Sequence, residues 1–237
     1  DTLTGCFAVG LAPTGSADPY ALRRNCIAAL RLLAEHPSFA TLRFEDLVRA
    51  SYKQFAAVFA AKKADLDENA TAAKISEFAN ERLRGVIAGQ TSNAVADAIL
   101  AGNENALERP ANALAKARSL QKVVGEAWIQ NARAVGKRLR GISKDAKPEN
   151  HAFAKDDAKN QRIASVVSTL DLATKDLAKT GVEAALQKFG DVSNELAKIF
   201  DEILVNDPND PTTPQRLEVL SFGASCMLRI ADFSRLG

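Results

Sequence analysis

The segment Asp18-Pro-Tyr-Ala-Leu-Arg-Arg-Asn-Cys-Ile-Ala-Ala-Leu-Arg-Leu-Leu-Ala-Glu-His-Pro37 carries the pattern that decides the fold. Its apolar residues recur with a period of 3.6, which is typical of a helix with one buried face: Leu22, Ile27, Leu30, Leu33 and Ala34. Asp18 is a suitable N-cap, and Pro19 suits the first helical position. The segment therefore predicts an amphipathic helix that starts at Pro19 and ends near His36.

The same period continues along the rest of the chain. It predicts further helices over residues 45–61, 71–87, 93–100, 110–123, 128–141, 163–178, 182–204 and 215–233. We expect Gly190 to interrupt one of these helices. Three prolines exclude a helix from Asn206–Pro214. No segment alternates apolar and polar residues convincingly, so the sequence predicts an all-α fold, a multi-helix array that ends in a helical bundle.

Charge is segregated along the chain, although the formal net charge is only +2. Residues 113–147 hold nine basic and two acidic residues, a local net charge of +7, which leaves the remainder acidic. A segregated cationic stretch attracts polyanions through counterion release, whereas the same charges spread evenly would not. The window is thus a candidate nucleic-acid contact.

Several other classes of function find no support. The three cysteines (Cys6, Cys26 and Cys226) form no C-x-x-C motif and are typical of reduced thiols in a cytoplasmic protein. His36 and His151 have no metal-ligand spacing, no apolar run approaches the roughly 20 residues of a membrane span, and no nucleophile or phosphate-loop motif occurs. We therefore expect no catalytic residue, no metal site and no membrane contact. Because the sequence opens on Asp1 rather than Met, we expect it to be a piece of a longer protein.

Two runs near the start resemble a known family. Asp1-Thr-Leu-Thr-Gly5 and Ala12-Pro-Thr-Gly-Ser-Ala-Asp-Pro-Tyr-Ala-Leu-Arg-Arg24 are similar to K-L-D-T-L-x-G and P-T-G-S-x-D-P-F-x-L-R-R of bacterial glycyl-tRNA synthetase beta subunits. Similar runs follow in the same order as in that family: Phe78–Ile87, Ala134–Ile142, Phe200–Val205 and Arg229–Leu236.

The resemblance implies that residues 1–150 form the tail of an HD-like domain plus linker helices. It implies that residues 151–237 form a helical anticodon-binding domain. It implies a glycine–tRNA ligase of alpha and beta subunits, with beta–beta or alpha–beta association. It also implies that the holoenzyme uses ATP and Mg on the alpha subunit. On this resemblance we expect the present chain to carry no cofactor and no catalytic residue and to bind glycine tRNA.

The predicted tRNA-binding residues are cations in three places. Lys137, Arg138, Arg140 and Lys144 lie in the basic window and suit phosphate contacts, with a solvated helix face as the alternative. Arg216, which the resemblance matches to a family arginine, is predicted either to bind an anticodon base or to form an ion pair with Asp207 or Asp210. The remaining two, Arg82 and Arg84, are predicted to contact RNA or to pair with Glu77 or Glu81.

Two other functions stay open at this point. The pattern from Phe200 to Leu220 is shared with the anticodon module of the arginine enzyme, so a different synthetase is one alternative. The other is a helical scaffold that serves subunit association without touching RNA. Salt-dependent RNA binding separates the scaffold from both synthetase hypotheses.

Overall fold

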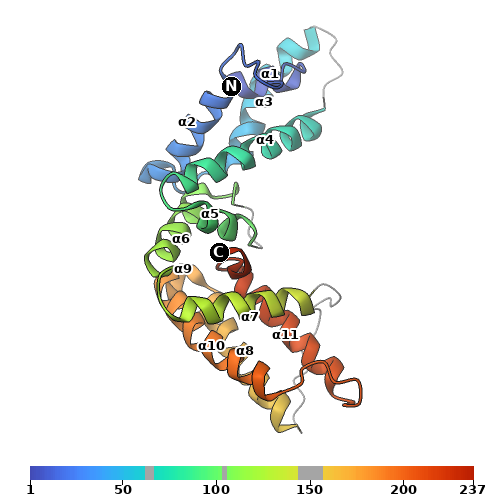
Figure 1. The fold of residues 1–237 in the computed structure, drawn as a ribbon. Helices are drawn as coiled ribbons and strands as arrows, with labels where there is room; N and C mark the ends of the chain where they lie inside the picture. Colours follow the sequence, from blue (N-terminus) through green and yellow to red (C-terminus); the bar gives the residue numbers. More distant parts are fainter. Residues whose placement is uncertain (62–66, 103–105, 144–156) are drawn as a thin grey trace. The chain divides into compact units, whose positions relative to one another are not determined.

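The computed structural model describes residues 1–61, 67–102, 106–143 and 157–237, and within these ranges the elements are helices without a β-strand (Figure 1). The all-α prediction is confirmed. The chain divides into two compact units. Unit 1 comprises Asp1–Ala96 and Asn105–Ala117, and unit 2 comprises Asp97–Glu104 and Arg118–Gly237.

Unit 1 is organised around one long helix. Its helices are α1 (Thr2–Ala8), α2 (Leu22–Glu35), the 3-10 turn η1 (Pro37–Phe39), α3 (Phe44–Ala61) and α4 (Glu68–Ala88). α4 contacts α1, α2 and α3, and its apolar face, with Ile75, Ala79 and Leu83, is fully buried. Two more helices, α5 (Asn93–Leu100) and α6 (Pro110–Val123), contain the positions where the two units divide.

The start of α2 differs from the prediction. The helix begins at Leu22 rather than at Pro19, because Ala21 adopts a left-handed conformation (φ 53°) that ends the preceding turn. Asp18 still caps the helix from outside it. One carboxylate oxygen accepts the Leu22 N–H at 2.7 Å, and the other accepts the Arg23 N–H at 3.0 Å.

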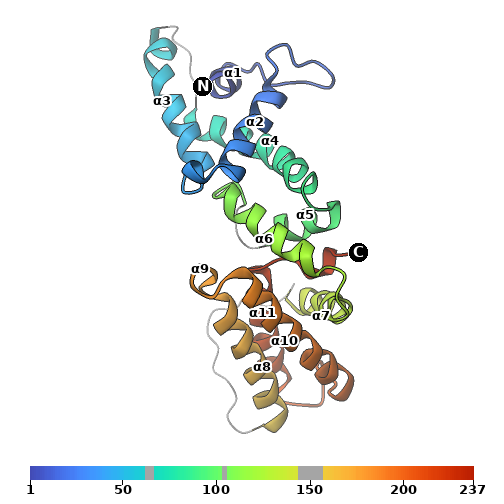
Figure 2. The same cartoon turned by 90° about the vertical axis from the view of Figure 1, so that its left-hand side faces the viewer.

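Unit 2 contains a bundle of four long helices (Figures 1 and 2). They are α7 (Trp128–Ile142), α8 (Ala158–Thr174), α10 (Val182–Glu202) and α11 (Thr213–Leu228). α7 contacts α10, α10 contacts α8, α8 contacts α11 and α11 contacts α7, so the contacts close into a ring. The short helix α9 (Leu177–Thr180) joins α8 to α10, and the 3-10 turn η2 (Phe233–Arg235) packs on α7.

Gly190 lies inside α10 and does not interrupt it, so that prediction was wrong. The glycine provides space instead of flexibility. A Cβ at this position would lie 3.1 Å from the Trp128 ring, which packs across α10 and also contacts Phe189 and Phe233. The Trp128 indole N–H donates to the Glu126 carboxylate at 2.6 Å. The single tryptophan of the chain is therefore half-buried and packs against core residues of unit 2.

The predicted boundary between domains, at residue 150, lies outside the described residues and stays a prediction. Around it, α7 packs into the same bundle as α8, α10 and α11. The compact unit thus begins further toward the N-terminus than the predicted anticodon-binding domain.

Candidate nucleic-acid interface

Helix α7 presents the most basic surface in the described part of unit 2. Its buried residues recur at helical spacing, with Ile129, Ala132, Val135, Gly136 and Leu139 facing the bundle. This register turns Lys137 and Arg138 toward solvent, where both are exposed. The two adjacent cations are therefore placed where a phosphate could reach them.

Lys137 and Arg138 are only weakly engaged by the protein. Arg138 Nη1 lies 3.9 Å from the Asp201 carboxylate, and both side chains are more than half exposed. Its guanidinium also stands 5.2 Å from the centre of the Phe200 ring. Exposed pairs of this kind contribute about 0–1 kcal/mol, so a polyanion can displace Asp201 at small cost. Among the described residues, no carboxylate pairs with Lys137.

Arg140 has a different role from its neighbours. Its Nε lies 3.4 Å from a carboxylate oxygen of Asp232, which is buried. The same carboxylate accepts hydrogen bonds from the N–H and hydroxyl of Ser234, at 3.2 and 2.6 Å. Arg140 thus helps to compensate a buried charge that anchors the end of the chain against α7, and it is less available to RNA than Lys137.

Much of the remaining basic window is also neutralised within the fold. Lys116 is buried, and Lys122 donates to Glu183 at 2.6 Å. Lys144, a predicted contact, lies outside the described residues. The net charge of the window therefore overstates the positive charge that is free on the surface.

Arg216 lies in the interior, with a side chain that is only 1% exposed. Its guanidinium donates to the side chains of Asn160 (Nε, 2.8 Å) and Asp210 (Nη2, 2.6 Å) and to the carbonyl of Leu204 (Nη1, 3.1 Å). In this arrangement it cannot reach an RNA base. Of the two predicted roles, the ion pair with Asp210 is the one that the structure contains.

This ion pair holds the proline-rich segment in place. The hydrogen bond from Arg216, followed by those from Thr212, keeps the pKa of the Asp210 carboxyl well below its usual range. Thr213 Oγ1 also donates to the Asp207 carbonyl at 2.7 Å. A buried arginine thus connects the start of α11 to the chain that leaves α10.

Arg82 and Arg84 lie on α4 of unit 1. The Arg82 guanidinium covers the Phe78 ring at 3.7 Å and pairs with Glu81 at 2.5 Å, so the alternative of an internal ion pair is the arrangement present. Arg84 lies within reach of Asn93 Oδ1, at 3.4 Å. Both residues belong to unit 1, whereas Lys137 and Arg138 belong to unit 2.

An apolar groove, which we call the α7–α10 groove, adjoins Arg138. It has a volume of about 600 Å³, within the range of small-molecule sites. Its lining residues come from the ends of α7 and α10, the following segment and α11: Arg138, Gly141, Ile142, Phe200, Ile203, Leu204, Val205, Asn206 and Leu217. The sequence reasoning missed this groove. Its only signal was the apolar run Ile203–Val205, which continues past the end of a helix.

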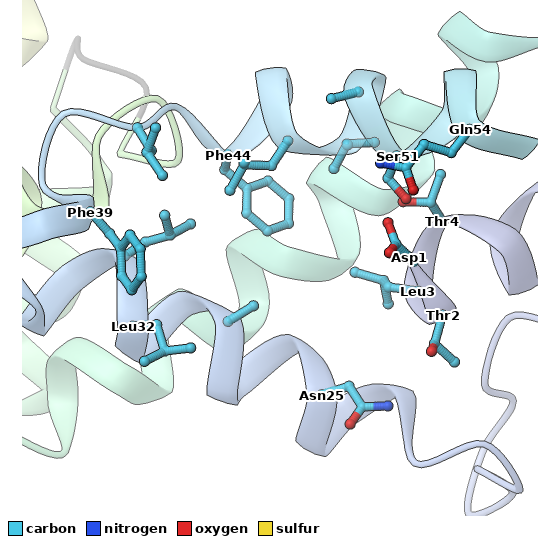
Figure 3. A pocket seen from close by; sticks show the side chains of 16 residues that line it. Asp1, Thr2, Leu3, Thr4, Asn25, Leu32, Phe39, Phe44, Ser51 and Gln54 are labelled. Atoms are coloured by element: carbon cyan, nitrogen blue, oxygen red, sulfur yellow. The ribbon is translucent and has the colours of Figure 1, made fainter.

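Unit 1 has a second groove, of about 550 Å³, between α1, α2 and α3. Figure 3 shows Phe39 and Leu32 at one end and a polar group, with Thr4, Ser51 and Gln54, at the other. Ser51 is buried, with 6% of the residue exposed, and its hydroxyl has no hydrogen-bond partner among the described residues.

The described residues include no cluster of three or more His, Cys, Asp or Glu that could hold a metal ion. None of the helices in the described ranges is long and apolar enough to cross a bilayer. Burial raises the pKa of the Cys26 thiol to about 11 and that of Cys226 to about 12. These two thiols are therefore protonated and unreactive near neutral pH.

Comparison with known proteins gives a consistent result. The family described as glycyl-tRNA synthetase beta subunit matches residues 1–101. The glycine–tRNA ligase beta subunit of Haemophilus influenzae (strain PittEE) is 30% identical over 240 aligned residues, which cover 100% of this chain and 33% of the relative. Those of Desulforamulus reducens and Syntrophotalea carbinolica are 26% and 28% identical with the same coverage.

The chain spans about a third of the length of these curated relatives. The match extends beyond residue 101 through both compact units, because it covers the chain completely. The chain is therefore a relative of the glycyl-tRNA synthetase beta subunits over its whole length, and it matches the C-terminal third of those proteins.

Proposed function

We propose that this chain is the tRNA-binding C-terminal part of a cytoplasmic glycine–tRNA ligase beta subunit. It would support the ATP-dependent joining of glycine to its tRNA, with the catalytic site, ATP and Mg on an alpha subunit. The observation that carries the proposal is the match of the whole chain to proteins named glycine–tRNA ligase beta subunit. The partners are then glycine tRNA and the alpha subunit.

The surface chemistry of unit 2 supports RNA binding by a limited set of cations. Lys137 and Arg138 are exposed and weakly paired, whereas Arg140 and Arg216 serve internal carboxylates. Cations that contact phosphates add affinity without reading sequence. Each contact contributes about 0.7 to 0.9 to the slope of log K against log salt concentration. A small number of such contacts predicts a moderate salt dependence.

Binding to a glycine tRNA transcript at two salt concentrations tests this proposal, with Lys137→Ala as the variant. The control is Lys179→Ala, another exposed lysine of unit 2. Lys179 lies just before the N-terminus of α10, whereas the α7–α10 groove adjoins the C-terminus of α10. At 1.5 Å per helical residue, the length of α10 separates the two places by about 30 Å.

We expect Lys137→Ala to weaken binding and to reduce the salt slope by about 0.7 to 0.9, whereas Lys179→Ala leaves both unchanged. Equal losses in the two variants would mean that the tRNA lies elsewhere on the chain. If the unmodified chain shows no salt-dependent binding, the proposal is wrong.

A second candidate is a scaffold for subunit association. The groove of unit 1 favours it, because apolar side chains stay partly exposed around that groove: Leu32, Phe39, Leu42 and Leu47. Exposed apolar patches mark protein contacts. On this alternative the chain would associate with an alpha subunit while failing to bind tRNA in the same titration.

A further inference from the structure

The α7–α10 groove leaves unusual apolar surface in contact with water. Leu204 is 68% exposed, and its neighbours Ile203, Val205 and Leu217 are only partly covered. Phe200 forms a buried part of the lining. A hollow apolar surface of this kind is typical of a binding site rather than of a solvated helix end.

A cation borders this apolar surface. Arg138 lines the groove with its guanidinium 5.2 Å from the Phe200 ring centre and its side chain 52% exposed. A guanidinium is planar, stacks on flat rings and binds phosphate. Lys137, the residue before Arg138 on α7, is also exposed but does not line the groove. The groove therefore offers an apolar recess with positive charge at its edge.

The lining of the groove also contains a polar side chain. The Asn206 amide lines the groove, and an amide can both donate and accept a hydrogen bond to the edge of a ligand.

The occupant that fits these features has a flat ring, polar groups on the ring edge and an adjacent negative charge. An unpaired nucleotide of RNA has all three, because its base can be turned out of the stack while its phosphate stays on the surface. An apolar peptide would fill the recess but would add no negative charge beside Arg138, whose ion pair with Asp201 is long and exposed, or beside the neighbouring Lys137. The charge at the edge therefore favours the nucleotide.

We propose that the α7–α10 groove binds one unpaired base of the bound RNA, with Arg138 against the ring or its phosphate. This inference rests on the proposed function. It assigns the base contact to residues at the ends of α7 and α10 instead of Arg216, which the fold uses internally.

Leu204→Glu tests the inference by placing a carboxylate in the recess. Leu172→Glu is the matched control, because Leu172 is a comparably exposed leucine (59%) on α8 that does not line the groove. The probe is a glycine tRNA transcript with 2-aminopurine at an anticodon position, whose fluorescence rises when the base leaves the stack. Trp128 fluorescence checks that each variant is folded, and Leu204→Ser is a milder second variant.

We expect Leu204→Glu to weaken binding by about tenfold, a loss within the range measured for single base contacts, and to abolish the 2-aminopurine signal. Leu172→Glu should change neither. If the unmodified chain binds tRNA with salt dependence while the two glutamate variants behave alike, the groove inference is wrong and the proposed function stands. If the unmodified chain does not bind tRNA, both are wrong. Loss of holoenzyme assembly in Leu204→Glu, with tRNA binding unchanged, would assign the groove to a protein partner and overturn the inference.

Discussion

Replacing Arg216 by methionine removes the guanidinium at the centre of the contacts between α8, α11 and the segment that follows α10. Methionine replaces the aliphatic stem of arginine with an unbranched apolar side chain but donates no hydrogen bond. The substitution removes one donor from five acceptors: Asn160 Oδ1, the carbonyls of Leu204 and Val205, the Asp210 carboxylate and Thr212 Oγ1.

The cost follows from burial. Removing one partner of a buried ion pair costs about 3–5 kcal/mol, because the other charge is left uncompensated. The Asp210 side chain remains 20% exposed, so water can partly hydrate it after the substitution. We therefore expect the free energy of unfolding of unit 2 to fall by about 3 kcal/mol, at the lower end of that range.

The assay is guanidinium unfolding followed by Trp128 fluorescence, which reports on unit 2 because this single tryptophan packs against its core residues. Arg229→Met is the control. Arg229 also pairs with an aspartate, Asp171, at 2.6 Å, but both side chains are nearly a third exposed. Its loss should cost about 1 kcal/mol or less. If Arg216→Met costs no more than the control, or weakens tRNA binding without lowering stability, the assignment of a structural role to Arg216 is wrong.

Three further predictions concern packing, burial and pH. Gly190→Ala places a Cβ 3.1 Å from the Trp128 ring; it should cost about 1–3 kcal/mol and shift the tryptophan emission, and an unchanged emission would contradict the packing described. Ser51→Ala removes a buried hydroxyl that has no partner among the described residues. Thermal unfolding followed by circular dichroism should show that it stabilises unit 1 by about 1 kcal/mol or more beyond the gain from helix propensity, which the half-buried control Ser76→Ala measures. Equal gains in the two variants would contradict this prediction. Because the folded-state pKa of Asp210 is depressed, its contribution to the free energy of unfolding is present above the ordinary aspartate pKa range and is lost as the pH falls through that range and below it. The difference in the free energy of unfolding between wild type and Asp210→Asn should therefore shrink on acidification. A constant difference would contradict the ion pair.

Helical periodicity predicted the architecture well. The predicted helix over residues 93–100 coincides with α5, and the others overlap the observed helices. Local sequence preferences failed to predict the helix boundaries and interruptions that tertiary contacts or an unusual backbone conformation determine. Gly190 has the lowest intrinsic preference for a helix after proline, but a bulky indole needs its missing side chain. Pro19 suits a first helical position, but the left-handed Ala21 delays the helix.

The candidate site was harder to predict, because a cation looks the same in sequence whether it is exposed or buried. Lys137 and Arg216 both lie on predicted amphipathic helices, yet one is exposed and the other is fully enclosed. Arg216 is held in part by Asn160, which lies 56 residues away along the sequence. Only the folded chain brings them together. The α7–α10 groove likewise requires the ends of helices that are distant in sequence to meet.

We propose that this chain not only binds glycine tRNA but also recognises its anticodon. The most direct measurement compares its affinity for a glycine tRNA transcript with that for the same transcript carrying a substituted anticodon, each at two salt concentrations. We expect binding that weakens with salt and weakens further with the substitution. Binding that depends on salt but not on the anticodon would contradict recognition, and the absence of binding at low salt would contradict the proposed function itself.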